Sequence, residues 1–281
     1  MRPSSTMFLV AALLVSVAAL AAPAAPAAPA LPVITTPEYT DLGPLVTVPP
    51  FFEDRVIYYN SFDDAKGTPQ INAAGLTQPG EVPTTGGGII GRGLDCAKLQ
   101  AFTLTGEAIS PHKPITLSLW WCMTKDVPID GGLGMLHLQG KGIVSNFVRG
   151  KGEWCGLQKP CAVFQVYYFP GIGNVNGLYD GSIWDRGALK AGVWHNTVLT
   201  ISAGTSLSLY TDGQRVCQVH TVGRPFALED GIRSAAFGCQ TGMLVDEVMV
   251  LDRALASWEV AEYYEAIRQM RAVGYTGNAE G

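Results

Sequence analysis

The sequence has little charge. Lysine, arginine, aspartate and glutamate make up 15% of its 281 residues, and the formal net charge is −5 at pH 7. No run of basic residues lies beside aromatic residues, so the pattern typical of a nucleic-acid-binding surface is absent. The sequence also shows no basic amphipathic helix of the kind that binds membrane surfaces. We therefore expect no nucleic-acid partner.

The sequence motifs of several enzyme classes are absent as well. The chain contains neither Gly-x-Ser-x-Gly nor His-Glu-x-x-His. No acidic residue has a second one two positions away, the spacing that places two carboxylates on one face of a strand. The adjacent pairs Asp63–Asp64 and Asp246–Glu247 would point to opposite faces of an extended strand. We expect no catalytic residues, although acids from different strands could still converge.

The first residues have the pattern of a secretory signal. Arg2 precedes an uncharged apolar run from Met7 to Ala22, and small residues suited to cleavage lie at its end. This run is shorter than the roughly twenty residues that span a bilayer, and prolines follow it. Residues 1–22 are thus predicted to be a signal peptide, and the mature protein to be extracellular, periplasmic or displayed on the cell surface without a membrane span. Retention of the signal as an anchor is the alternative.

The remaining chain divides into a linker, one domain and a tail. Residues 23–51 are rich in alanine and proline and lack periodic apolar positions, as an extended tether does. Residues 52–272 fit a single large all-β domain, because sandwiches often exceed 200 residues. Residues 273–281 are expected to be a flexible tail.

Apolar residues in the domain alternate with polar ones, which is typical of half-buried strands. The sequence contains 33 glycines and 18 prolines that separate these segments. Strands are predicted at Val56 to Phe62, Ala101 to Leu104, Ile115 to Cys122, Gly134 to Leu138, Ile143 to Val148, Ala162 to Phe169, Val193 to Ile201, Ser206 to Tyr210, Arg215 to His220 and Leu244 to Leu251. We expect two antiparallel sheets packed face to face. Asp212-Gly213 predicts a tight hairpin turn, and a helix capped by Ser257 is predicted to follow the last strand.

Six cysteines in an exported chain predict three disulfides, although the sequence leaves the pairing open. Suggested pairs are Cys155 with Cys161, Cys217 with Cys239, and Cys96 with Cys122. A metal site is the alternative, but no Cys-x-x-Cys occurs and the four histidines are far apart. His195 lies beside Trp194 on a predicted strand, where we expect a packing or hydrogen-bonding role.

Five segments occur in the order found in one family. They are Tyr59-Asn-Ser-Phe-Asp-Asp64, Thr116-Leu-Ser-Leu-Trp120, Trp194-His195, Tyr210-Thr-Asp-Gly213 and the stretch from Val245 to Leu255. Together they resemble laminin G-like, pentraxin-type domains of the concanavalin A-like lectin and glucanase superfamily, over roughly residues 56 to 266. The resemblance implies an all-β, two-sheet antiparallel jelly-roll β-sandwich with a short C-terminal helix. It does not imply one function, because the superfamily includes lectins, adhesion modules, glucanases and lyases.

The resemblance also implies a calcium ion. Related domains often hold one with acidic residues from the opening and closing strands, and Asp63, Asp64 and Asp246 occupy those places. Calcium prefers hard oxygen ligands. The ion would be structural, and the alternative roles are a solvated turn for Asp63–Asp64 and a cap or ion pair with Arg253 for Asp246.

The stretch from Gly150 to Gly187 combines aromatic with amide and acidic residues. Aromatic faces stack on sugar rings, and amides and carboxylates bond to hydroxyl groups. The predicted ligand-binding residues are Trp154, Tyr168, Asn176, Tyr179, Asp180, Trp184 and Asp185. The alternative is an ordinary core strand followed by a long loop.

The sequence therefore predicts a secreted, non-catalytic, lectin-like module that binds carbohydrate or a glycosylated partner. The second hypothesis is a structural or protein-adhesion module that uses its tether for reach. The third is a polysaccharide hydrolase or lyase.

Overall fold

The structure of the protein is a computed structural model. It describes residues 52, 54–64, 66–80, 82–85, 87–96, 102–110, 113–126, 132–139, 144–149, 161–169, 173–178, 191–202, 206–220, 234–238 and 242–272. The predicted signal peptide, linker and tail fall outside these residues and stay predictions. No helix in the described part is long and apolar enough to cross a membrane.

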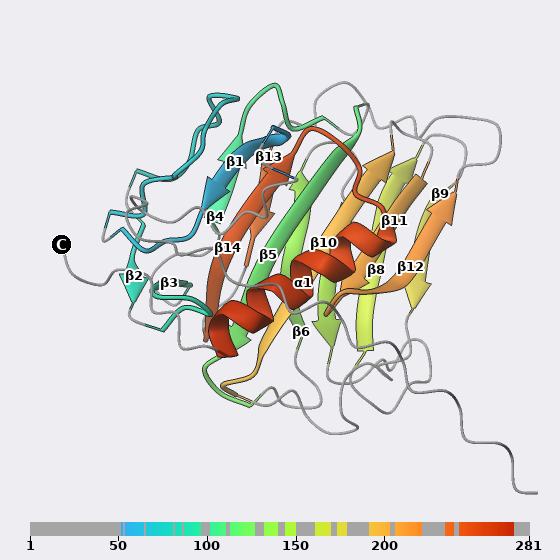
Figure 1. Ribbon diagram of the computed structural model, residues 1–281. Coiled ribbons are helices and arrows are strands. Elements are labelled where there is room, and N and C mark those ends of the chain that lie inside the picture. Colours follow the sequence, from blue (N-terminus) through green and yellow to red (C-terminus); the bar gives the residue numbers. More distant parts are fainter. Residues whose placement is uncertain are drawn as a thin grey trace, which may run out of the picture. The chain divides into compact units, whose positions relative to one another are not determined.

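The strands form two antiparallel sheets (Figure 1). Sheet A contains, in spatial order, β12 (Gln214–His220), β11 (Ser206–Thr211), β10 (Trp194–Ser202), β5 (Ile115–Met123), β14 (Met243–Leu251), β3 (Gly93–Asp95) and β2 (Thr84–Thr85), and β1 (Val56–Asn60) also pairs with β14. Sheet B contains β4 (Phe102–Thr105), β13 (Ser234–Phe237), β6 (Gly132–Gln139), β7 (Val144–Arg149), β8 (Cys161–Phe169) and β9 (Gly173–Leu178). The predicted all-β sandwich is confirmed.

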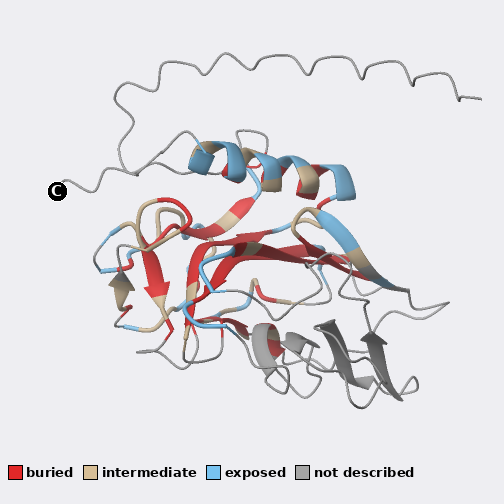
Figure 2. Ribbon diagram, turned by 90° about the horizontal axis from the view of Figure 1, so that it is seen from below, coloured by how far each residue is buried: buried red, intermediate tan, exposed pale blue. Residues whose placement is uncertain are grey.

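Helix α1 (Ser257–Ala272) lies across the face of sheet A that points away from sheet B (Figures 1 and 2). Strand β5 is buried along its whole length because it is covered on both faces. Leu117, Leu119 and Trp121 join the core between the sheets. Trp120 and Cys122 join a second apolar cluster, which includes Val260, Tyr263 and Ile267 of α1. Sheet A is thus the middle layer of three.

The opposite-face prediction for Asp246 and Glu247 is wrong. The pairing of β14 with β5 is irregular between Asp246 and Met249, and Glu247 has a φ of 51°. This bulge breaks the alternation of side chains, and both acids are fully buried. Asp246 Oδ1 also accepts a hydrogen bond from the Glu247 N–H at 2.9 Å.

The start of α1 differs from the prediction in its cap. The Val260 N–H donates to the Ala256 carbonyl at 3.1 Å, which makes Ala256 the N-cap and Ser257 the first helical residue. Glu259 supplies the cap from inside the helix, because its Oε2 accepts the Ala256 N–H at 2.7 Å. Arg253 pairs with Glu259 at 2.7 Å, and not with Asp246.

The suggested disulfide between Cys96 and Cys122 is also wrong. The two cysteines are not joined, because they lie on opposite faces of sheet A. Cys96 belongs to the core between the sheets and Cys122 to the cluster beneath α1. The side chains in the other suggested pairs, Cys155 with Cys161 and Cys217 with Cys239, lie outside the described part of the structure.

Candidate functional site

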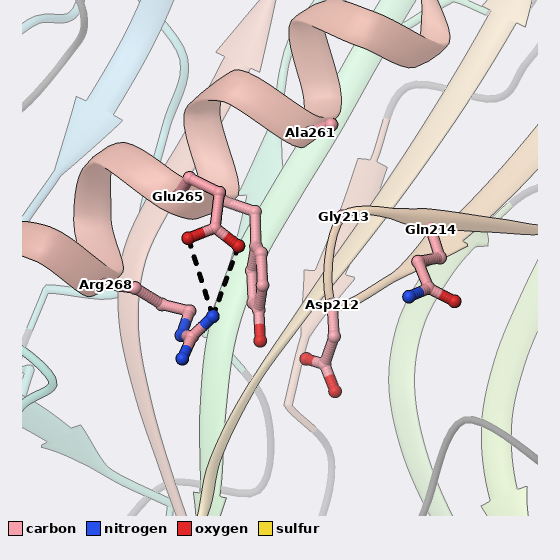
Figure 3. Close-up of a pocket in the computed structure, with 7 residues that line it drawn as sticks. Asp212, Gly213, Gln214, Ala261, Glu265 and Arg268 are labelled. Carbon is pink, nitrogen blue, oxygen red and sulfur yellow. Dashed lines mark hydrogen bonds and ion pairs between the residues drawn. The ribbon is translucent and has the colours of Figure 1, made fainter. Parts of the chain in front are cut away.

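A pocket of about 410 Å³ lies between α1 and the turn that joins β11 to β12 (Figure 3). The turn contributes Asp212, Gly213 and Gln214, and the helix contributes Ala261, Tyr264, Glu265 and Arg268. The helical residues follow i, i+3, i+4 and i+7 spacing, so they share one side of α1. This volume lies within the range of small-molecule sites.

The turn wall of the pocket has the predicted hairpin geometry. Asp212 and Gly213 have φ angles of 50° and 75°, the left-handed values that a tight hairpin turn requires at both central positions. The adjoining strands pair from Thr211 and Gln214 outward. This places the exposed Gln214 side chain at the rim of the pocket.

Asp212 is fixed from strand β10. Its Oδ1 accepts the Asn196 N–H at 2.9 Å, and its Oδ2 lies 2.8 Å from His195 Nδ1. The His195 ring in turn lies 4.8 Å from the ring of Trp121, between centroids. The expected packing and hydrogen-bonding role of His195 is confirmed. Both oxygens of Asp212 are engaged, so this carboxylate positions the turn and adds negative charge to the pocket.

The helix wall centres on Tyr264. Its ring stacks on Trp120 with centroids 5.3 Å apart and planes 5° from parallel. The Arg268 guanidinium carbon lies 5.5 Å from the same ring centroid, a cation–π distance. Burial raises the pKa of the Tyr264 phenol, and the negative charge of Asp212 raises it further. Tyr264 is therefore a neutral hydrogen-bonding group at physiological pH.

The rim of the pocket carries an ion pair. Glu265 and Arg268 are joined at 3.2 Å, and about half of each side chain is exposed. Surface pairs of this kind contribute little to stability and exchange readily with water. Together with the Gln214 amide they offer acceptors and donors for a ligand with several hydroxyl groups.

The acids predicted to bind calcium accept backbone hydrogen bonds, and two of them, Asp63 and Asp246, hold the 89–92 loop. Asp246 Oδ2 accepts the N–H groups of Ile89 and Ile90 at 2.8 and 3.3 Å, and Asp63 Oδ1 accepts the Arg92 N–H at 2.9 Å. Asp64 is exposed, and its Oδ1 accepts the Lys66 N–H at 2.9 Å within a turn. Each of these three carboxylates thus accepts at least one backbone N–H, and Asp63 Oδ2 also accepts the Ser61 hydroxyl at 2.9 Å.

The loop fits tightly against these carboxylates. A Cβ atom at Gly91, whose φ is 59°, would lie within 2.0 Å of Asp63 Oδ1. No group of three or more histidine, cysteine, aspartate or glutamate side chains in the described part is arranged to hold a metal ion. The described contacts give Asp63 and Asp246 a structural role in holding the 89–92 loop, and the calcium site stays a prediction.

Asp246 and Glu247 form a second acidic group beneath α1. Burial raises the pKa of Asp246 well above its ordinary value, and the charges of Glu247 and Asp63 raise it further. Glu247 Oε2 accepts a hydrogen bond of 2.5 Å from the Tyr59 hydroxyl. Raised pKa values often mark functional sites. These two acids are fully buried, however, so a ligand cannot reach them without displacement of covering residues.

The ligand-binding residues predicted from sequence lie mostly outside the described part of the structure. Trp154, Tyr179, Asp180, Trp184 and Asp185 are among the residues that it does not describe. Tyr168 lies on β8 and Asn176 on the adjacent β9, where it pairs with Gln165. Their proposed role in binding stays a prediction.

Sequence reasoning missed the pocket. The sequence singled out Asp212-Gly213 as a hairpin turn and as part of a family resemblance, and it predicted the helix, but it did not indicate that the two meet. Nothing in the sequence marks Gln214, Glu265 or Arg268 as members of one site, because the turn and the helix lie far apart along the chain. The available signal was the helical spacing of Ala261, Glu265 and Arg268 on the less apolar side of α1.

Comparison with known proteins identifies the fold. No protein-family model and no curated protein sequence matches the chain. The structure is similar to domain 4 of AbnA, a GH43 extracellular arabinanase from Geobacillus stearothermophilus solved in complex with arabinotriose. The TM-score is 0.54 at 15% identity, and the match covers 75% of this chain and 98% of that domain.

Two toxin domains are similar to the chain as well. The binding domain of Paraclostridial Mosquitocidal Protein 1 matches with a TM-score of 0.54 at 13% identity, and the botulinum neurotoxin serotype G binding domain with 0.52 at 12%. Each match covers 75% of this chain but only 52% and 50% of those structures, so the chain spans about half their length. At these identities the likeness establishes a β-sandwich fold, without specifying a laminin G-like member.

Proposed function

We propose that this protein is a secreted, non-catalytic module that binds a glycan or a glycosylated partner. The observation that carries the proposal is the pocket between α1 and the β11–β12 turn. It combines a neutral phenol, an amide and an exposed ion pair, which are the groups that bind hydroxyls in a polar ligand. Its walls belong to a helix and a tight hairpin, so binding would require little ordering of the backbone.

The structural neighbours support a binding role. The AbnA domain, which was solved with arabinotriose, is matched over almost its whole length. The two similar toxin domains are both named as binding domains. These names describe other proteins, and they make carbohydrate the first ligand to test here.

The acids of the pocket support binding without chemistry. Asp212 uses both oxygens to hold the turn, and Glu265 is paired with Arg268. Glycoside hydrolysis requires one carboxyl group that donates a proton and a second that acts as base or nucleophile. The other acidic pair, Asp246 and Glu247, is buried beneath the helix. A hydrolase or lyase is thus the weaker alternative.

A glycan array probed with the purified protein tests the proposal. Binding to a defined set of glycans, with no shortening of those glycans on prolonged incubation, is the expected result. If a folded sample binds no glycan on the array, the result would contradict carbohydrate binding and favour protein adhesion. Detection of shortened glycans would show that the protein is an enzyme and would contradict the non-catalytic role.

Two parts of the proposal rest on sequence. The aromatic and polar residues between Gly150 and Gly187 are proposed as a further glycan-binding surface. A structural calcium at Asp63, Asp64 and Asp246 is a separate proposal, and the hydrogen bonds from the 89–92 loop are its alternative. Thermal unfolding with EDTA or with calcium separates the two, because a calcium site requires a lower midpoint in EDTA, whereas the hydrogen bonds alone predict equal midpoints.

A further inference from the structure

Trp258 is the most exposed large apolar side chain among the described residues. Its exposed fraction is 60%, and the other exposed large apolar side chain in this set is Val193 at 45%. Tryptophan exposes a broad ring face when it does not pack in a core, and such faces stack on sugar rings. Single exposed apolar residues are common on surfaces, so the position of Trp258 decides whether it has a role.

Trp258 continues the line of residues that forms the helix wall of the pocket. Ala261 follows it by three residues and Glu265 by seven, which places all three along one stripe of α1. The axial distance from Trp258 to Arg268 is about 15 Å, because a helix rises about 1.5 Å per residue. The pocket occupies one end of this stripe and the indole occupies the other.

The first turn of α1 holds Trp258 in place. Glu259 bonds to the Ala256 N–H and to Arg253, and the Ser257 hydroxyl lies 3.2 Å from the Tyr210 hydroxyl. The residues on both sides of Trp258 are therefore tied to the preceding chain and to sheet A. A ligand that stacks on this indole therefore has to order the side chain but not the backbone.

The charges of the pocket limit the ligand. Asp212 and Glu265 carry two negative charges and Arg268 one positive charge. Arg268 already pairs with Glu265, so an anionic sugar would have to displace a carboxylate in a site with an excess of negative charge. A neutral sugar requires no such displacement.

From these observations we infer that the site binds a neutral oligosaccharide along α1, with one sugar ring in the pocket and a later ring stacked on Trp258. The inference rests on the proposed glycan-binding function and extends it in two respects. Affinity increases with the number of sugar units, and neutral chains are preferred over chains of uronic acids.

Isothermal titration with oligosaccharides of increasing length tests the inference. The probes are neutral arabino-, xylo-, manno- and cello-oligosaccharides from one to six units, with oligogalacturonides as the acidic series. Trp258→Ala is compared with wild type, and Val193→Ala serves as the control for loss of an exposed apolar side chain. Both substitutions are on the surface, so circular dichroism and thermal unfolding should match wild type.

The expected result is a roughly tenfold or greater loss of affinity for the longer neutral chains in Trp258→Ala, a loss typical of truncating a tryptophan that contributes strongly to a binding interface. Affinity for the single sugar should change less than about twofold, and Val193→Ala should bind as wild type does. If wild type binds neutral chains and Trp258→Ala binds them equally well, or if uronic acid chains bind more tightly, the inference is overturned while the proposed function stands. Absence of binding by wild type to every probe overturns both.

Discussion

Gly213 and Tyr264 are in such close contact that a side chain at position 213 would require the tyrosine ring to shift. A Cβ atom at position 213 would lie 3.0 Å from Cδ1 and 3.1 Å from Cβ of Tyr264. Gly213 belongs to the turn wall of the pocket and Tyr264 to its helix wall. This contact therefore sets the distance between the two walls.

Gly213→Ala should destabilise the protein by about 1–3 kcal/mol, because it adds a methyl group at a positive φ. Gly75→Ala is the matched control, since Gly75 has a φ of 60° but no atom within 4 Å of its added Cβ. Urea unfolding should show a larger loss for Gly213→Ala, because only this variant must also displace Tyr264. Equal losses of unfolding free energy in the two variants would show that crowding of Tyr264 by the added methyl group does not reduce stability.

Glu259→Ala should reduce stability by about 2 kcal/mol, because one carboxylate both caps α1 and pairs with Arg253. Glu262→Ala changes an exposed residue of the same helix and should cost less than about 0.5 kcal/mol. Unfolding midpoints of the two variants measure the difference. A cap formed by Ser257, as the sequence predicted, would instead make Ser257→Ala the more costly change.

Asp246 should make stability depend on pH. Its pKa in the folded protein lies well above the value of about 3.9 in an unfolded chain. Between these two pKa values the folded protein holds a proton that the unfolded chain has released. The contribution of this group is therefore complete below about pH 4 and is lost as the pH rises through the pKa of the folded state.

Asp246→Asn removes this titration. Across the range from about pH 4 to about pH 7, the free energy of unfolding of wild type should fall relative to that of Asp246→Asn. Asp252→Asn, at an exposed carboxylate paired with Arg55 at 3.7 Å, should keep the wild-type slope. Parallel pH profiles for wild type and Asp246→Asn would contradict a raised pKa at Asp246.

Trp184→Ala tests the surface predicted between Gly150 and Gly187. If this surface binds the glycan, loss of the indole should weaken binding to the glycans identified on the array by about tenfold. Trp154→Ala provides a second aromatic probe in the same stretch. Unchanged affinity in both variants would leave the pocket at α1 as the binding surface.

Most of the fold was predictable because strand alternation is a local property. All ten predicted strands form, and the hairpin at Asp212-Gly213 has the predicted geometry. The missed strands are short, as with β2, β3 and β13, or glycine-rich, as with β9. Their pairing depends on partners that are distant in the sequence, so the local pattern is weak.

The errors share a physical cause. The bulge at Glu247 changes which faces of the strand Asp246 and Glu247 occupy. A bulge inserts one extra residue into a strand, and the alternation of apolar and polar residues does not reveal where this happens. The third layer formed by α1 buries Cys122 on the face of sheet A opposite Cys96. The pocket depends on the same layer, because it exists only where the helix meets a turn from another part of the chain.

The measurement that tests the account most directly is the affinity of the Gln214→Ala variant for a glycan that wild type binds. Gln214 is an exposed pocket residue, and Gln269→Ala is the matched control at an exposed position of α1 outside the pocket. The account predicts about a fivefold to tenfold loss for Gln214→Ala, the value of roughly one hydrogen bond, and wild-type affinity for Gln269→Ala. Equal affinity in wild type and both variants would show that the glycan does not bind between α1 and the β11–β12 turn.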